Sequence, residues 1–198
     1  SWLSGYFIFQ LFVPVLFKYN GPELAGRMGM TISVVNAVQS LGLIWINIRI
    51  PEFCGLIANK QWSMLQILFK RTTGLAVVAT IMMSLMVFLA IWGFRADFLL
   101  LDRLLPLGEV GMMMLAVCCQ VLISAWAIFM RCFKKEPLLI PSIVGALLSA
   151  ISTLTLGKYW SSLGMVVGYL CISLVFGLSS TYLIWRHFVR QHCVPVYI

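Results

Sequence analysis

Long apolar runs separated by short polar turns dominate this sequence. Each run is close to about 20 residues, the length that a helix needs to cross about 30 Å of hydrocarbon. The clearest case follows the basic turn RCFKKEP, where one apolar run leads to the turn GKYW and a second run leads away from it, as in a membrane hairpin. The pattern predicts an all-α integral membrane protein with six spans, near residues 2–17, 27–48, 74–94, 108–130, 138–157 and 162–185.

The segment between the second and third predicted spans is too polar to cross a membrane, but it is apolar on one helical face. That face carries Phe53, Leu56, Ile57, Met64, Ile67 and Leu68, and Pro51 suits a first helical turn. The pattern predicts one amphipathic helix over residues 51–70 that lies in the membrane interface, with Lys60 extending its ammonium group toward water.

Composition excludes a soluble domain, because 62% of the residues are hydrophobic, 10% are charged and the mean hydropathy is +1.00. The net charge of +8 does not indicate nucleic-acid binding, because the 14 Lys and Arg residues lie in short loops. The six cysteines form no CxxC motif and no metal-ligand spacing with histidine. We expect no metal site, no cofactor and no enzymatic activity, since no hydrolase triad, phosphate-cradling loop or zincin motif is present.

The basic residues divide unequally between the two sides of the predicted spans. One side carries Arg49, Lys60, Lys70, Arg71, Arg131, Lys134, Lys135, Arg186 and Arg190, whereas the other carries Lys18, Arg27, Arg95, Arg103 and Lys158. Short loops rich in Lys and Arg stay cytoplasmic, so both ends of the chain are predicted to be cytoplasmic. Because the chain starts inside an apolar run without Met, we expect it to be a fragment of a longer protein.

Polar residues within the spans form stripes at helical spacing. The second span carries Gly29, Ser33, Asn36, Ser40 and Asn47 with Gln39 beside them; the fourth carries Gln120, Ser124 and Arg131; the fifth carries Ser142, Gly145, Ser149, Ser152 and Thr153. Such stripes are typical of close helix packing, which we favour for the fifth span, or of a water-filled cavity whose amides suit sugar hydroxyls. Both interpretations stay open for the second span. The candidate cavity-lining residues are Asn36, Gln39, Ser40, Asn47, Gln120 and Ser124.

The positions of the charged residues relative to the spans give two further indications. All six acidic residues fall in loops or at helix ends, so this region lacks the buried carboxylate that would bind a proton or an organic cation. Arg27, Arg49 and Arg131 lie at span ends, where a guanidinium fork can bind a diphosphate. The commoner role of arginines at such positions is to anchor the helix ends on lipid phosphates.

Several segments resemble the C-terminal half of polysaccharide transporters of the O-antigen flippase type, in the multidrug/oligosaccharidyl-lipid/polysaccharide (MOP) exporter superfamily. These segments are GYFIFQLFVPVLFKYNGPELAGRMGMT, IRIPEFCGLIANKQWSMLQILFKRT, DRLLPLG, MRCFKKEPLL and LGKYWSSLGMVVGYL. The resemblance implies one six-helix lobe of a transporter of about twelve helices that works by alternating access, with the N-terminal lobe missing from this chain. The implied cargo is an undecaprenyl-diphosphate-linked oligosaccharide, carried across the bacterial inner membrane.

Two other functions stay open at this point. One is an exporter of the same architecture with another cargo, such as a drug or cation, or a teichoic acid or peptidoglycan precursor. The other is a membrane scaffold that transports nothing and whose polar stripes are packing seams.

Overall fold

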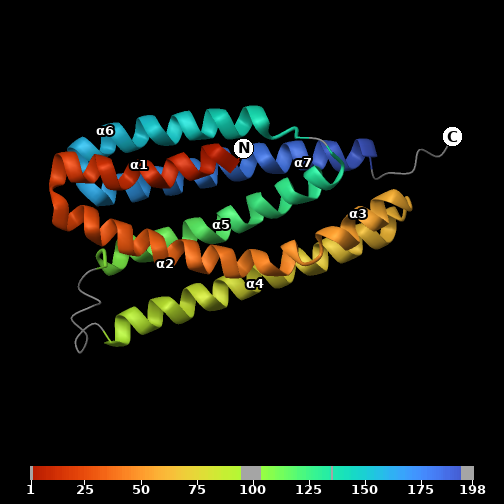
Figure 1. The fold of residues 1–198 in the computed structure, drawn as a ribbon, viewed down its shortest axis with the longest axis horizontal. Helices are drawn as coiled ribbons and strands as arrows, with labels where there is room; N and C mark the ends of the chain where they lie inside the picture. Colours follow the sequence, from red (N-terminus) through yellow and green to blue (C-terminus); the bar gives the residue numbers. More distant parts are fainter. Residues whose placement is uncertain (1, 95–103, 135, 193–198) are drawn as a thin grey trace.

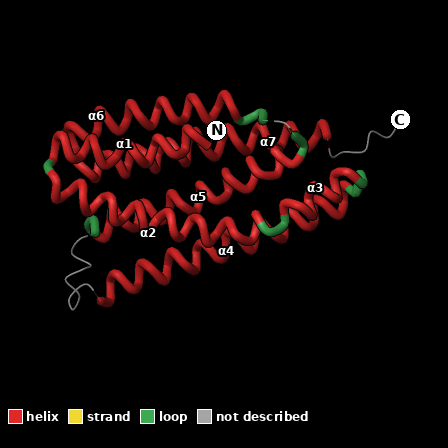
Figure 2. Tube along the Cα trace, viewed as in Figure 1, coloured by secondary structure: helices red, strands yellow, loops and turns green. Residues whose placement is uncertain are grey.

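A computed structural model of the chain describes residues 2–94, 104–134 and 136–192, and all regular structure in these ranges is helical (Figures 1 and 2). The elements are α1 (Trp2–Asn20), α2 (Pro22–Asn47), α3 (Ile50–Ala58), α4 (Trp62–Phe94), α5 (Leu107–Cys132), α6 (Leu139–Cys171), the π-helix η2 (Ile172–Leu178) and α7 (Ser179–His192). The all-α prediction is confirmed.

The long helices lie side by side along the longest axis of the molecule (Figure 1). α2 packs against α1, α4 and α5, and α6 packs against α1. Four helical stretches are long and apolar enough to cross a membrane: Pro22–Ala58, Trp62–Gly93, Leu107–Cys132 and Leu139–Gln191. These stretches are typical of a membrane protein.

The fourth stretch contains a sharp reversal at Ser161. This residue has φ 57° and ψ −147° in the middle of α6, a conformation that breaks the helix. Gly168 faces Ser152 and Gly145 faces Phe176, so the chain after Ser161 runs back along the chain before it. The segments predicted over 138–157 and 162–185 therefore form an antiparallel helical pair.

The single amphipathic helix predicted over residues 51–70 is wrong. The chain leaves helical geometry after Ala58, where Lys60 adopts φ 55°. The Gln61 N–H donates to the Leu56 carbonyl at 3.0 Å and the Lys60 N–H to the Ile57 carbonyl at 3.1 Å, the two bonds of a Schellman C-cap. A nine-residue helix, α3, thus ends here, and residues 62–70 instead form the first turns of α4.

The break also changes which residues of this segment are buried. Met64 and Ile67, which belong to the predicted apolar face, are exposed, whereas Leu65 and Phe69 are buried. Phe53 is buried as predicted, because α3 packs against both α4 and α5.

Aromatic side chains join α3, α4, α5 and α7 at the end of the bundle where α3 lies. Phe69 lies between Phe53 and Phe129, with ring centroids 6.0 and 4.5 Å away, and Trp126 stacks on Trp185 at 5.9 Å. Aromatic pairs of this kind contribute about 0.5–1.5 kcal/mol each beyond the burial of their area. The cluster holds α3 and α7 against the C-terminal end of α5, beside the cavity described next.

Candidate functional site

A cavity of about 840 Å³ lies between α2, α3, α5, α6, η2 and the start of α7. Its volume falls within the range of about 300–1,000 Å³ that is typical of ligand sites. The lining extends from the middle of the bundle, at Asn36, Gln120 and Ser149, to the end where α2 and α5 finish, at Asn47 and Arg131. Among the described residues, the first turns of α2 and α5 contribute nothing to it, so the cavity occupies one half of the bundle.

The wall from α2 carries the polar stripe of that helix. Asn36, Gln39, Ser40 and Asn47 all line the cavity. The adjoining face of α2 is buried, with Met28, Val35 and Ile46 at 0–1% exposure. The apolar face therefore sets the rotation of α2, and the amides face the cavity.

The cavity amides retain unused hydrogen-bonding capacity. In the described part of the chain, no hydrogen bond engages the side chains of Asn36, Gln39, Asn47 or Gln120. Ser33 on the same helix differs, because its hydroxyl donates to the Gly29 carbonyl at 3.0 Å. A carboxamide without a partner costs several kcal/mol in an apolar medium, so these side chains require water, a ligand or another polar surface beside them.

The wall from α5 contains the three polar residues predicted for that helix. Gln120 and Ser124 are half-buried, Arg131 is exposed at the last turn, and all three line the cavity. Val121, Ala125 and Phe129 are buried on the opposite side. The same division into a packed face and a cavity face therefore occurs on both helices.

The residues after Pro137 form a wall that the sequence interpretation only partly identified. Ser142, Gly145 and Ser149, which we had assigned to helix packing, line the cavity, whereas Ser152 packs against Gly168 and Thr153 is buried. The cavity residues that were missed from the C-terminal part include Tyr169, Ser173, Phe176, Gly177, Ser180 and Thr181. Ser173, Gly177 and Thr181 follow one another at intervals of four residues, a spacing that indicates a shared helical face. This spacing could have identified them from the sequence.

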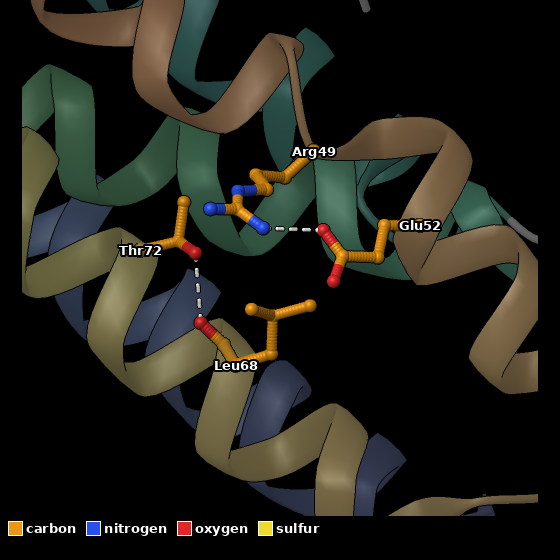
Figure 3. A network of polar contacts seen from close by, with 4 residues as sticks. All are labelled: Arg49, Glu52, Leu68 and Thr72. Atoms are coloured by element: carbon orange, nitrogen blue, oxygen red, sulfur yellow. Dashed lines mark hydrogen bonds and ion pairs between the residues drawn. The ribbon is translucent and has the colours of Figure 1, made fainter.

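Two of the three candidate arginines lie outside the cavity lining. The Arg27 guanidinium pairs with Glu23 at 2.9 Å, one helical turn away near the start of α2. Arg49 pairs with Glu52 at 2.5 Å across the junction of α2 and α3, where Figure 3 shows the two side chains directed toward each other. The same view shows the Thr72 hydroxyl of α4 donating to the Leu68 carbonyl. Of the three candidate arginines, Arg131 alone lines the cavity.

The electrostatic character of the lining is neutral to positive. Arg131 is the one charged side chain among the described lining residues. The expectation that this region lacks a buried carboxylate is wrong, because Glu109 is buried in the first turn of α5 near Ser162. It is the one buried acidic residue in the described ranges, and it lies at the end of α5 opposite Arg131, outside the lining. No group of three or more His, Cys, Asp or Glu side chains in the described ranges could hold a metal ion. The cavity can thus offer amides, hydroxyls and one guanidinium to a ligand.

The fold and cavity define the molecule as a helical membrane protein with a polar hollow. In comparisons with known proteins, no protein-family model, no curated protein and no solved structure matches this chain. The functional argument therefore depends on the cavity and on the resemblance noted above.

Proposed function

We propose that this chain is one lobe of a membrane flippase that carries a lipid-linked oligosaccharide across the bacterial inner membrane by alternating access. In this proposal α1, α2, α4, α5 and the two antiparallel parts of the chain on either side of Ser161 form six spans. Both ends of the chain are cytoplasmic, and the cavity opens toward the cytoplasm. A second lobe of the same transporter faces the cavity.

The observation that carries the proposal is the set of unpaired carboxamides in the cavity. Sugar hydroxyls donate and accept hydrogen bonds, and a carboxamide offers both functions on one side chain. Asn36, Gln39, Asn47 and Gln120 together present four such groups from two helices. An organic cation would need a carboxylate, and the described lining contains none.

The surfaces beside the cavity support a cargo with a lipid tail. On α2 the apolar Leu41 and Ile44 are exposed next to Ser40, and on α6 Ile140 and Ile143 are exposed next to Ser142. A polar hollow bordered by lipid-facing apolar strips lets a glycan head group enter while the prenyl chain stays in the bilayer.

The direct test is the double substitution Asn36→Leu and Asn47→Leu in the protein produced from its complete gene. We expect surface polysaccharide to fall about tenfold or more at matched expression and the lipid-linked precursor to accumulate, because two amide contacts are worth about 2 kcal/mol or more. Ser33→Leu is the matched control, since Ser33 is exposed on the same helix outside the lining and bonds only within it.

Normal export by the double variant would show that these two amides do not take part in transport. A loss of resistance to a cationic drug, with normal polysaccharide export, would instead assign the cavity to another cargo of the same architecture.

A further inference from the structure

Two cysteines from different helices meet at the edge of the cavity. Cys54 lies on α3, Cys132 is the last residue of α5, and both line the cavity. Their thiol groups are close enough to hydrogen-bond to each other, although the two residues are far apart in the sequence. Cys54 is exposed, Cys132 is half-buried, and both are free thiols. The pair could not be recognised from sequence spacing, because it depends on the packing of α3 against α5.

Packed aromatic neighbours hold the backbone on both sides of this thiol pair. Phe53, the residue before Cys54, is fully buried, and its ring contacts Phe69 of α4. Phe69 in turn contacts Phe129, which is buried on α5 three residues before Cys132. The two sulfur atoms are therefore held beside each other by the fold itself, and the exposed Cys54 side chain has room to change rotamer as it reacts.

The other cysteines in the described ranges are arranged differently. Cys118 and Cys119 are adjacent on one helix, so their side chains point in directions about 100° apart. Cys171 is exposed at the end of α6, outside the cavity lining. None of the described His, Cys, Asp or Glu side chains joins Cys54 and Cys132 in a group of three, whereas a structural zinc site takes four ligands. The pair is therefore suited to dithiol–disulfide chemistry rather than to zinc binding.

We propose that Cys54 and Cys132 form a reversible oxidation site, at which a small-molecule disulfide converts the two thiols to an intramolecular disulfide. The Cys54 thiolate attacks one sulfur of the small disulfide and releases the other sulfur as a thiol. Cys132 then loses its proton and attacks the Cys54 sulfur of this mixed disulfide, which releases the second small thiol. Two protein sulfurs are oxidised, the small disulfide is reduced to two thiols, and these thiols take up the two protons.

The oxidation site rests on the proposed function only for its compartment, because the proposed orientation places this end of the cavity in the cytoplasm. Thiols are kept reduced there, and the disulfides that do form are usually transient and often sense the redox state. α3 is a nine-residue helix between its junction with α2 and the break at Lys60. A bridge from Cys54 to Cys132 would attach α3 covalently to the end of α5 and restrict its movement beside the cavity.

The experiment treats the complete purified protein with glutathione disulfide and identifies the joined peptides by mass spectrometry. In a variant that retains only Cys54 and Cys132, we expect a bridge in most molecules, reversed by dithiothreitol. The bridge should form about tenfold or more faster than in the matched control that retains only Cys54 and Cys171, because only the first pair is held together. It should also raise the thermal midpoint by about 5 °C or more, since it closes a long loop.

Equal bridging rates in the two variants, a mixed disulfide on Cys54 without a bridge, or bridges only between separate molecules would overturn the oxidation site. If the cysteine-depleted variants do not fold, the same peptides are mapped in the wild-type protein, where Cys132→Ser should abolish the bridge. Neither measurement involves export, and Asn36→Leu with Asn47→Leu leaves both cysteines intact. Absence of the bridge together with impaired export by that double variant would therefore reject only the oxidation site.

Discussion

Gly42 determines how closely α2 approaches α4 and α5. A Cβ atom at this position would collide with the Thr80 hydroxyl on α4 and lie 3.5 Å from Val121 Cγ2 on α5. Thr80 is fully buried, and its Oγ1 donates to the Ala76 carbonyl at 2.7 Å. Because the β-branched side chain is stiff, it cannot turn away without losing this bond. The glycine thereby fixes the position of the helix that carries the cavity amides.

Gly42→Ala should therefore destabilise the protein by about 1–3 kcal/mol, the usual cost of overpacking a tight contact. The fluorescence-detected thermal midpoint in detergent provides the measurement. Gly74→Ala is the control, because a Cβ at Gly74 meets open space and alanine favours a helix by about 1 kcal/mol. Adding Thr80→Ala to Gly42→Ala should restore part of the loss; equal midpoints for Gly42→Ala and Gly74→Ala would contradict this account.

At individual positions, the sequence predicted the cavity walls of α2 and α5 better than it predicted the arginines. Asn36, Ser40 and Asn47 share a face by helical geometry alone, so their common environment follows from one element. The roles of Arg27 and Arg49 depend on neighbours within one turn, Glu23 and Glu52, which occupy both guanidinium groups. An acidic residue three or four positions from an arginine in the sequence was enough to predict such ion pairs.

Ser161 carries the backbone strain of the reversal in α6. Its φ of 57° with ψ of −147° lies in a region that only glycine adopts readily, and other residues pay about 1–3 kcal/mol there. The seam beyond it is tight: a Cβ at Gly164 would be 2.6 Å from Trp160 Cβ and 3.1 Å from the Leu156 carbonyl oxygen. Close packing of the two helices holds the strained residue in place.

Ser161→Gly should raise the thermal midpoint, because glycine removes the Cβ clash in this conformation, with a gain of up to about 1 kcal/mol after its larger backbone entropy loss. Ser161→Ala should leave the midpoint near the wild-type value, since alanine keeps the Cβ. Ser161→Val should lower it. A fall in the midpoint for Ser161→Gly would show that the serine side chain, not the backbone, stabilises the turn.

Among the elements, the long helices and the turn near Ser161 were predictable, whereas the break after α3 and the π-helix were not. Apolar runs of about 20 residues report local composition, so α1, α2 and α5 match the predicted spans closely, but α4 begins at Trp62, well before the predicted start at residue 74. The end of α3 depends on backbone hydrogen bonds around Lys60, which apolar periodicity does not detect. The π-helix Ile172–Leu178 depends on tertiary neighbours: Gly145 faces Phe176, and a Cβ at Gly177 would lie 2.9 Å from Ile123 Cδ1.

The molecule as a whole is asymmetric along its length. The cavity occupies the half that contains the ends of α2 and α5, and the other half is packed around buried residues such as Phe12, Met113 and Met165. Phe12 and Tyr169 meet edge to face with ring centroids 5.9 Å apart, at the boundary between the two halves. The proposed transporter lobe and a scaffold of packed seams differ at this hollow, because a packed seam leaves no room for water beside its polar residues and an open hollow does.

A cysteine at position 36 should therefore react with a membrane-impermeant maleimide. In a background without the native cysteines, we expect Asn36→Cys to be labelled in inside-out vesicles and protected in right-side-out vesicles. Val35→Cys is the matched control, because Val35 is 1% exposed on the packed face of the same helix and should resist labelling from either side. Labelling of Asn36→Cys only in right-side-out vesicles would reverse the topology, and protection in both would favour the scaffold.

In the proposed transporter, a water-filled hollow that stops halfway through the bundle would also reshape the membrane voltage. Water in the hollow keeps its interior close to the potential of the adjoining solution, so the voltage drop concentrates across the packed half around Phe12 and Met165. A charge that leaves the hollow through that half crosses nearly the full potential in a short step, worth about 2.3 kcal/mol per elementary charge at 100 mV. In the proposed transport cycle, the electrical work on a charged cargo would therefore fall on the opening of the packed half, and entry into the hollow would be almost independent of voltage.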